Sequence, residues 1–239
     1  MIWKIAQMKI LAVDTAEQSC SIALVEDGVP VCESFLINRT THSRTLMDTI
    51  ARMVEKEAAI TINDIDGFIA ACGPGSFTGL RIGISVVKGL AFALSKPLAG
   101  VSSLDGIAFQ FTFSSIPVCV LMDAKRSEVY FAMYHFSNGR LIKKSEELVL
   151  SPEEAISIAA VNSKCLFAGS GAVAFRPMIQ QLMEDKALFA LPFQNFIKAS
   201  ALANIIFEDI SRLSLSPDGI IPVYLRRSDA EINYAHQHQ

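Results

Sequence analysis

The stretch CGPGSFTGLRIG at residues 72–83 puts four glycines and a proline between an apolar run and a segment typical of a helix. It lacks the GK[ST] ending of a P-loop, and Gly73, Gly75 and Gly79 are one residue out of the GxGxxG spacing. The loop therefore favours a tight turn whose glycines allow close packing. An anion at the start of the helix remains the alternative.

The helix predicted at residues 78–94 carries only two charges, Arg81 and Lys88, which are seven residues apart and share a face. Small side chains recur every four residues along it, at Gly79 and Gly83 and again from Ser85 through Gly89 to Ala93. Each glycine inside a helix costs about 0.5–1 kcal/mol against alanine. Several of them in one helix indicate a compensating close contact.

A second helix is predicted at residues 43–58, with a wide apolar arc. One stripe holds Leu46, Ile50 and Met53, and the adjoining stripe includes Met47 and Val54. A helix that covers a sheet needs one stripe, so the other must meet another element or another molecule. The sequence of this helix alone leaves both options open.

The plan of the chain is duplicated. An apolar run ends at Asp14 before a hairpin, and 109 residues later a similar run ends at Asp123 before another hairpin. The hairpin turns are predicted at Asp27-Gly28 and Asn138-Gly139. A strand and GxG turn follow each hairpin, at Gly73 to Gly75 and at Gly169 to Gly171. This indicates two similar α/β lobes, and coincidence of ordinary turn signals is the alternative.

We expect a first lobe at residues 1–110 and a second at 111–197. A helix and segment at 198–225 should pack back on the first lobe, followed by a polar tail at 226–239. Ser151 and Glu154 form a capping box with Pro152 at the first helical position, and Pro177 opens another helix.

Composition restricts the class of protein. The chain has 239 residues, 51% of them hydrophobic, and a formal charge of −3 without a basic block, so no footprint for nucleic acid is visible. Five scattered cysteines argue against a disulfide framework or a zinc site. Residues 106–122 are uncharged but polar enough to favour a loop and a buried strand over a membrane span. We expect a cytoplasmic protein without a signal peptide.

The sequence shows no convincing catalytic set. The histidines have no metal-binding spacing, and the serines before Asp105 are explained as a helix cap. Asp14 and Asp123 are the best candidates because each ends a strand, although an aspartate there more often caps the following turn. No metal and no cofactor are expected.

Five segments together resemble the bacterial TsaB (YeaZ) family, a subunit of the machinery that makes threonylcarbamoyladenosine in tRNA. They are MKILAVDTAEQSCSIALVEDG, THSRTL, GPGSFTGLRIGISVVKGLAFALSKPLAGVSSLDGIA, MDAKRSEVYFAMY and PVYLR. The match runs from about residue 8 to residue 226, and GPGSFTGLRIG is its most specific part. The resemblance implies a duplicated actin-like (ASKHA, ribonuclease H-like) two-lobe α/β fold.

The resemblance also implies a role as a non-catalytic partner of TsaD, the catalytic subunit, with the ATPase TsaE as a third member. It implies a homodimer in isolation and contact with tRNA only through the complex. The expected interface lies on the two helices, at His42, Leu46, Met47, Ile50, Met53, Val54, Gly79, Ile82, Gly83, Val86 and Leu90. Asp14, Gly73, Gly75, Ser76, Asp123, Gly169 and Gly171 remain as a possible vestigial nucleotide or anion site.

TsaD holds its metal through an NHxxxH-type motif, and Ser103 and Ile107 stand where the two histidines would be. A serine hydroxyl is a poor ligand for a transition metal and isoleucine is none. The resemblance therefore implies a catalytically inactive relative of TsaD. Two alternatives stay open: an ATP-dependent phosphotransferase of the same fold, and a metallopeptidase of the glycoprotease type.

Overall fold

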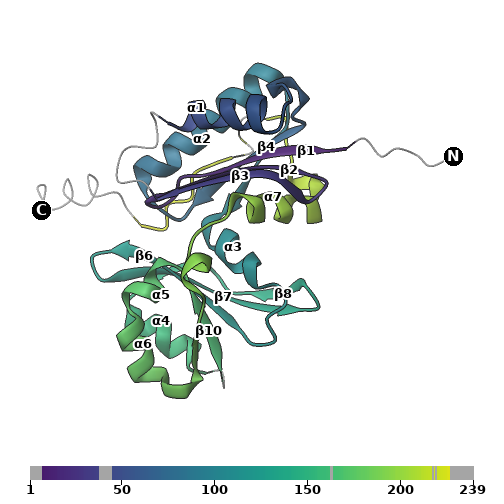
Figure 1. Ribbon diagram of the computed structural model, residues 1–239. Coiled ribbons are helices and arrows are strands. Elements are labelled where there is room, and N and C mark those ends of the chain that lie inside the picture. Colours follow the sequence, from purple (N-terminus) through teal and green to yellow (C-terminus); the bar gives the residue numbers. More distant parts are fainter. Residues whose placement is uncertain (1–6, 38–44, 162–163, 217, 219, 227–239) are drawn as a thin grey trace, which may run out of the picture. The chain divides into compact units, whose positions relative to one another are not determined.

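The computed structural model describes residues 7–37, 45–161, 164–216, 218 and 220–226. The chain forms two compact units, each with its own sheet (Figure 1). Unit 1 comprises the described residues within Met1–Gln110 and Phe196–Pro222. Unit 2 comprises those within Phe111–Asn195 and Val223–Gln239.

The sheet of unit 1 has the strand order β3-β2-β1-β4-β5. Its strands are β1 (Lys9–Asp14), β2 (Ser19–Glu26), β3 (Val29–Ile37), β4 (Gly67–Gly73) and β5 (Leu98–Ser102). β1, β2 and β3 pair antiparallel, whereas β1, β4 and β5 pair parallel. Asp27 and Gly28, with φ angles of 50° and 82°, confirm the predicted turn between β2 and β3.

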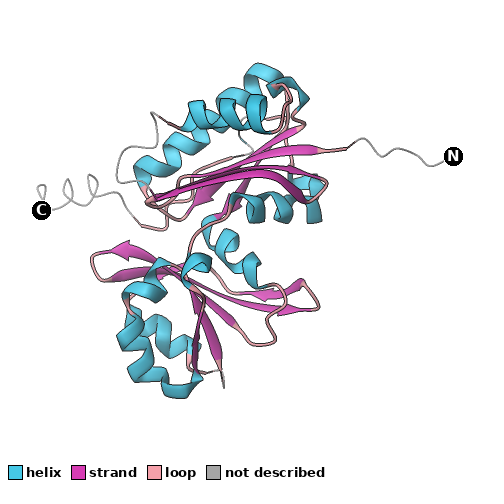
Figure 2. Ribbon diagram, in the orientation of Figure 1, coloured by secondary structure: helices cyan, strands magenta, loops and turns pink. Residues whose placement is uncertain are grey.

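Helices cover both faces of this sheet, and this explains why β1, β2 and β4 read as continuous apolar runs (Figures 1 and 2). The first face carries α1 (Leu46–Arg52), which continues as a π-helical turn η2 (Met53–Glu57), and α2 (Phe77–Leu94). The second face carries α3 (Ser103–Ala108) and α7 (Ala199–Glu208). Short 3₁₀ turns are η3 (Ile62–Asp64), η4 (Phe109–Phe111) and η7 (Ile210–Arg212).

The sheet of unit 2 has the strand order β11-β10-β6-β7-β8, with β9 paired to β7. Written from its other edge, β8-β7-β6-β10-β11, it repeats the order of unit 1. Its strands are β6 (Val118–Lys125), β7 (Glu128–Ser137), β8 (Arg140–Lys144), β9 (Leu148–Leu150), β10 (Cys165–Ala168) and β11 (Ala187–Phe189). β6, β7 and β8 pair antiparallel, and β6, β10 and β11 pair parallel.

The two sheets therefore confirm the predicted duplication strand by strand. β6 corresponds to β1 and β10 to β4, so Asp14 and Asp123 lie in equivalent strands of the two units. The 109-residue spacing of the two aspartates therefore reflects a repeated strand order, and not a coincidence of ordinary turn signals. The result is a duplicated α/β fold, as the sequence pattern predicts, and of the actin-like, ribonuclease H-like type that the resemblance implies.

The helices of unit 2 are α4 (Pro152–Ala159), α5 (Ser170–Ala174) and α6 (Arg176–Met183), with 3₁₀ turns η5 (Glu184–Lys186) and η6 (Pro192–Asn195). The capping box at α4 is confirmed: the Oγ of Ser151 accepts a hydrogen bond from the N–H of Glu154, whose carboxylate accepts from the N–H of Ser151. The core packs strands β6, β7 and β10 against these helices around Leu121, Phe131 and Phe167.

Candidate functional site

The glycine loop packs against the two residues that follow β1. The N–H of Ser76 donates to the carbonyl oxygen of Ala16 (2.7 Å), and the Oγ1 of Thr15 donates to the carbonyl oxygen of Gly79 (2.7 Å). The Oγ of Ser76 caps α2 by accepting from the N–H of Gly79 (3.2 Å). These bonds occupy groups at the start of the helix that an anion would otherwise use.

Three glycines of the stretch make this approach possible because a Cβ atom would collide with the neighbouring chain. At Gly75 it would meet Ala16, at Gly79 the carbonyl oxygen of Thr15, and at Gly83 the Oγ1 of Thr15. Close packing, the favoured interpretation of the loop, is what the geometry of residues 75–83 displays.

Asp14 ends β1 with a side chain that is fully buried. Its Oδ1 accepts from the N–H of Ala16 (2.9 Å), and its Oδ2 has no hydrogen-bond partner among the described residues. Burial raises the pKa of this carboxyl from 3.8 to about 8, and the nearby Glu17 adds to the rise. A neutral carboxylic acid in this position is not an anionic ligand for a metal-nucleotide complex.

The equivalent residue of unit 2 has a different environment. The two carboxylate oxygens of Asp123 accept from the N–H and the Nζ of Lys125, at 2.8 and 2.6 Å. The N–H of Asp123 donates to the Oγ of Ser170, between Gly169 and Gly171. A Cβ at Gly171 would touch the backbone of Leu121, so this GxG turn also serves close packing.

The candidate nucleotide or anion residues are divided between the two units. Unit 1 holds Asp14, Gly73, Gly75 and Ser76 where β1 and β4 end, and unit 2 holds Asp123, Gly169 and Gly171 where β6 and β10 end. In unit 2, local hydrogen bonds account for both carboxylate oxygens of Asp123, and close packing accounts for Gly171. In unit 1, close packing accounts for Gly75, whereas the Oδ2 of Asp14 has no partner among the described residues.

The expected partner interface is only partly at the surface. Six of its residues are buried by the chain itself and cannot contact a partner in this fold: Leu46, Ile50, Met53, Val54, Gly79 and Gly83. Their apolar character is explained by the core of unit 1, so on α1 both stripes contribute residues to this core. His42 lies outside the described residues.

The outer face of α1 and α2 is made by other residues. Met47 is 45% exposed, and Ile82, Val86 and Leu90 are half-buried on α2. Sequence reasoning missed Phe92, which is 79% exposed. Its signal was its position three residues after Gly89, on the same side of the helix.

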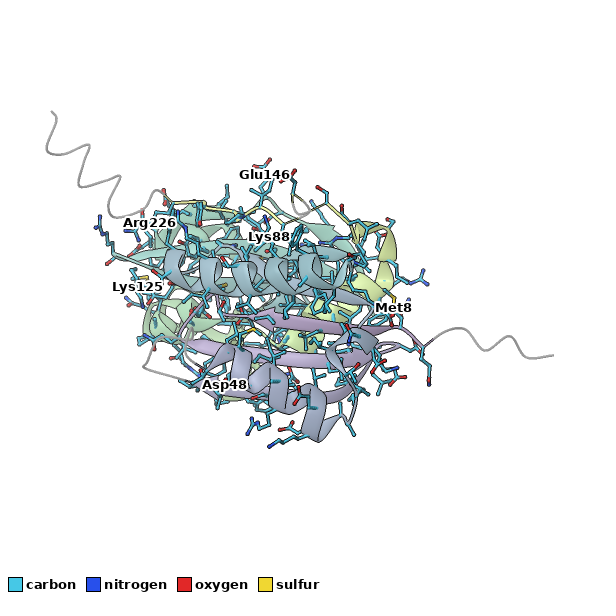
Figure 3. All side chains as sticks on the ribbon, turned by 90° about the horizontal axis from the view of Figure 1, so that it is seen from above. Met8, Asp48, Lys88, Lys125, Glu146 and Arg226 are labelled. Carbon is cyan, nitrogen blue, oxygen red and sulfur yellow. The ribbon has the colours of Figure 1, made fainter. Side chains whose placement is uncertain are left out.

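Small residues open a path along this outer face. Ser85, Gly89 and Ala93 are exposed, and a Cβ added at Gly89 would meet no atom of the described residues within 4 Å. In Figure 3, which views the molecule from above, α1 with Asp48 and α2 with Lys88 lie on the same side of the sheet, nearest the viewer, with strands visible between them. We call this surface, formed by Met47, Ile82, Ser85, Val86, Gly89, Leu90, Phe92 and Ala93, the outer helical face.

α2 is long and apolar enough to cross a membrane by length and composition, and no other helix of the described residues passes that test. Its inner side packs on β4 and β1 of unit 1. A core helix of a globular unit meets the same criterion.

Ser103 and Ile107, which the resemblance sets against the metal-binding histidines of TsaD, are not a pair of metal ligands. Ser103 and Ile107, both on α3, are fully buried, and the Oγ of Ser103 has no partner within the described part of the chain. Among the described residues there is also no group of three His, Cys, Asp or Glu side chains that would hold a metal ion. These residues do not fit the metal of TsaD.

Two sheets of the same order, each with helices on its strands, define a duplicated actin-like α/β protein. A family model described as TsaD, tRNA N6-adenosine threonylcarbamoyltransferase, matches residues 36–234. The TsaB proteins of Haemophilus influenzae and Bacillus subtilis are named tRNA threonylcarbamoyladenosine biosynthesis proteins. The first is 30% identical over 92% of this chain and 94% of its own length, and the second 28% identical over 95% and 98%.

A solved structure of YeaZ from Pseudomonas aeruginosa is similar with a TM-score of 0.73 and 28% identity, covering 91% of this chain and all of that one. The chain therefore belongs to the TsaD family and, within it, to the TsaB (YeaZ) proteins. The resemblance found in its sequence motifs is confirmed.

Proposed function

We propose that this chain acts in the biosynthesis of threonylcarbamoyladenosine in tRNA, as a non-catalytic subunit that docks on TsaD. The pathway is supported by the TsaB names of relatives that span nearly the whole chain. In the same proposal TsaE is a third member, tRNA is reached only through the complex, and the protein works in the cytoplasm without contact with a membrane.

The non-catalytic role is supported by two buried positions. Ser103 and Ile107 replace the histidines expected of TsaD and are covered by the core of unit 1. Asp14, the other candidate for chemistry in unit 1, is buried with a raised pKa. Because these positions offer neither a metal ligand nor an accessible carboxylate, the role of the subunit in this proposal is to bind TsaD and not to catalyse a reaction.

The observation that carries the docking proposal is the outer helical face. Phe92 exposes most of its ring beside Gly89, which has no atom against it. An exposed phenylalanine and a glycine inside a helix are both unfavourable for a free surface, and both are explained if another helix packs there. Ser85, Gly89 and Ala93, spaced by four, let that helix approach closely.

The test is the association state of the purified chain, measured by size-exclusion chromatography with light scattering, alone and with TsaD. We expect a homodimer alone and a heterodimer with TsaD. Gly89→Arg should abolish both without unfolding the chain, because the site is open in the monomer.

Val161→Arg is the matched control because Val161 is an apolar residue of unit 2 that is 88% exposed. This variant should associate as the wild type does. A wild-type chain that stays monomeric and ignores TsaD at high concentration would refute the proposal, as would a Gly89→Arg variant that still binds.

A further inference from the structure

A buried acid of unit 1 has no use in the proposed function. The carboxyl of Asp14 is fully buried, and only its Oδ1 has a described hydrogen-bond partner, the N–H of Ala16. A buried ionised carboxylate needs a cation or several donors to offset the loss of hydration. The described structure gives Oδ2 neither.

Strand register places this side chain on the face of the sheet that carries α7. Asp14 pairs directly with Ser21 across β1 and β2, and directly opposed residues point to the same face. The Oγ of Ser21 accepts from the N–H of Ala199, the first residue of α7 (2.9 Å). Asp14 is therefore next to the contact that fastens the start of α7 to the sheet.

That contact belongs to a short polar chain. The Oγ of Ser21 also donates to Glu33 (3.3 Å), and Glu33 accepts from the N–H and the Oγ of Ser200 at 3.3 and 3.0 Å. The first two residues of α7, Ala199 and Ser200, are thus hydrogen-bonded to side chains of β2 and β3. Water that reached Asp14 from this side would compete for the same bonds.

Within the part of the chain that the structure describes, the charged and titratable groups on the surrounding elements form no ion pair with Asp14. They are Glu17 in the loop after β1, Cys20 on β2, Glu33 on β3, Cys72 on β4, Asp105 on α3 and Lys198 before α7. Lys198 is the one cation of this set, and its Nζ lies 4.2 Å from the centre of the Phe35 ring. The charges of α2, Arg81 and Lys88, belong to the opposite face of the sheet.

We propose that Asp14 is held as the neutral acid inside unit 1 and that its loss of a proton releases the start of α7 from the sheet. The acid then works as a pH-dependent latch, independent of the docking function proposed above. Opening exposes the carboxyl, which ionises in water and gives its proton to solvent. Rising pH therefore favours the open state.

The direction and range follow from the two protonation equilibria. In the closed unit burial raises the pKa of Asp14 to about 8, whereas an exposed aspartate has a pKa of about 3.9. Between these values opening releases one proton, so the opening equilibrium constant should rise about tenfold per pH unit. Above the higher value the dependence should level off.

The first test observes the acid itself in the full wild-type chain labelled with ¹³C-aspartate. The carboxyl signal of Asp14, assigned by its absence in Asp14→Asn, should be that of a neutral acid at pH 6 and should titrate several units above an ordinary aspartate. A titration near the ordinary value would overturn the proposal. If the variant does not fold, through-bond correlation from the backbone of Asp14 in the wild type gives the same assignment.

The second test is hydrogen exchange of the amides of α7, corrected for the intrinsic effect of pH. Opening at Ala199, Leu202 and Ala203 should increase about tenfold per pH unit between pH 5 and 7 in the wild type and stay constant in Asp14→Asn. Asp123→Asn is the matched control from the equivalent strand of unit 2 and should behave as the wild type. Equal pH dependence in Asp14→Asn would refute the latch.

Discussion

The hydroxyl of Thr15 donates a hydrogen bond to the carbonyl oxygen of Gly79, 2.7 Å away, and so joins the end of β1 to the first turn of α2. The same threonine lies against Gly83 one turn later. A contact within unit 1 therefore explains why glycine is needed at Gly79 and Gly83 of the most specific motif in the chain.

Gly83→Ala should destabilise the chain by about 1–3 kcal/mol, because its Cβ would overlap the Oγ1 of Thr15. In a Thr15→Ala background this penalty should shrink, since the overlapping atom is gone. Gly79→Ala should stay costly in both backgrounds because its Cβ meets the backbone oxygen of residue 15. Urea unfolding of the single and double variants measures these differences, and equal costs in both backgrounds at Gly83 would contradict them.

Gly89→Ala should stabilise the chain, whereas Gly83→Ala should destabilise it. The position is open, so alanine gains helix propensity of about 0.5–1 kcal/mol without a clash. The same urea titration compares it with Gly83→Ala in the same helix. The titration is made with protein dilute enough to be monomeric, where a loss of stability at Gly89 would show that this side of α2 is covered within the chain.

Substitutions on α1 should separate folding from docking. Ile50→Asp buries a charge in the core of unit 1 and should cost more than about 4 kcal/mol, which prevents folding rather than breaking a dimer. Met47→Asp, on the exposed side, should leave the melting temperature nearly unchanged and weaken binding to TsaD. Circular dichroism reports the first effect and titration calorimetry with TsaD the second; a soluble, folded Ile50→Asp chain would argue against this core.

Asp14 should make the chain less stable as pH rises. The folded chain keeps the proton up to a pKa of about 8, while the unfolded chain releases it near 4, so the free energy of unfolding falls between these values. Asp14→Asn removes this contribution, and its stability relative to the wild type should increase steadily from pH 5 to 8. A difference between the two proteins that is independent of pH would mean that the acid is ionised in the native state.

Loss of the capping box at the start of α4 should lower the stability of the chain. Ser151→Ala removes the acceptor for the N–H of Glu154 and should cost about 1 kcal/mol. Hydrogen bonds from Ser151 lower the pKa of Glu154, so the contribution of this glutamate is present at neutral pH and is lost as pH falls through that lowered pKa. Thermal melts of both proteins at pH 7 and pH 3 test this: the difference should be smaller at the lower pH.

The sequence was sufficient for the fold because its signals were local and repeated. Asp27-Gly28, Asn138-Gly139 and the capping box at Ser151 each determine one turn or one helix start, and the matching strand ends at Asp14 and Asp123 predict the duplication. The structure confirms all of these. Such features depend on a few neighbouring residues and need no knowledge of tertiary contacts.

The candidate site was harder to predict because burial depends on contacts distant in sequence. Helical spacing shows that Ile50 and Met47 lie on different stripes, but only the sheet beneath α1 decides which stripe is covered. The glycine ladder has the same ambiguity: Gly83 faces Thr15, whereas Gly89 faces solvent. The missing hydrogen-bond partner of Asp14 could not be inferred without coordinates.

The position of α7 has a consequence for synthesis of the chain. The strands of unit 1 are complete at Ser102 and α3 follows at once, but α7, the other helix on their second face, begins at Ala199, about 100 residues later. At translation rates of about 5–20 residues per second, that face waits roughly 5–20 s for its cover. During this interval the part of the sheet face that α7 covers stays exposed on the ribosome-bound chain. A chaperone that binds nascent chains would bind this apolar surface.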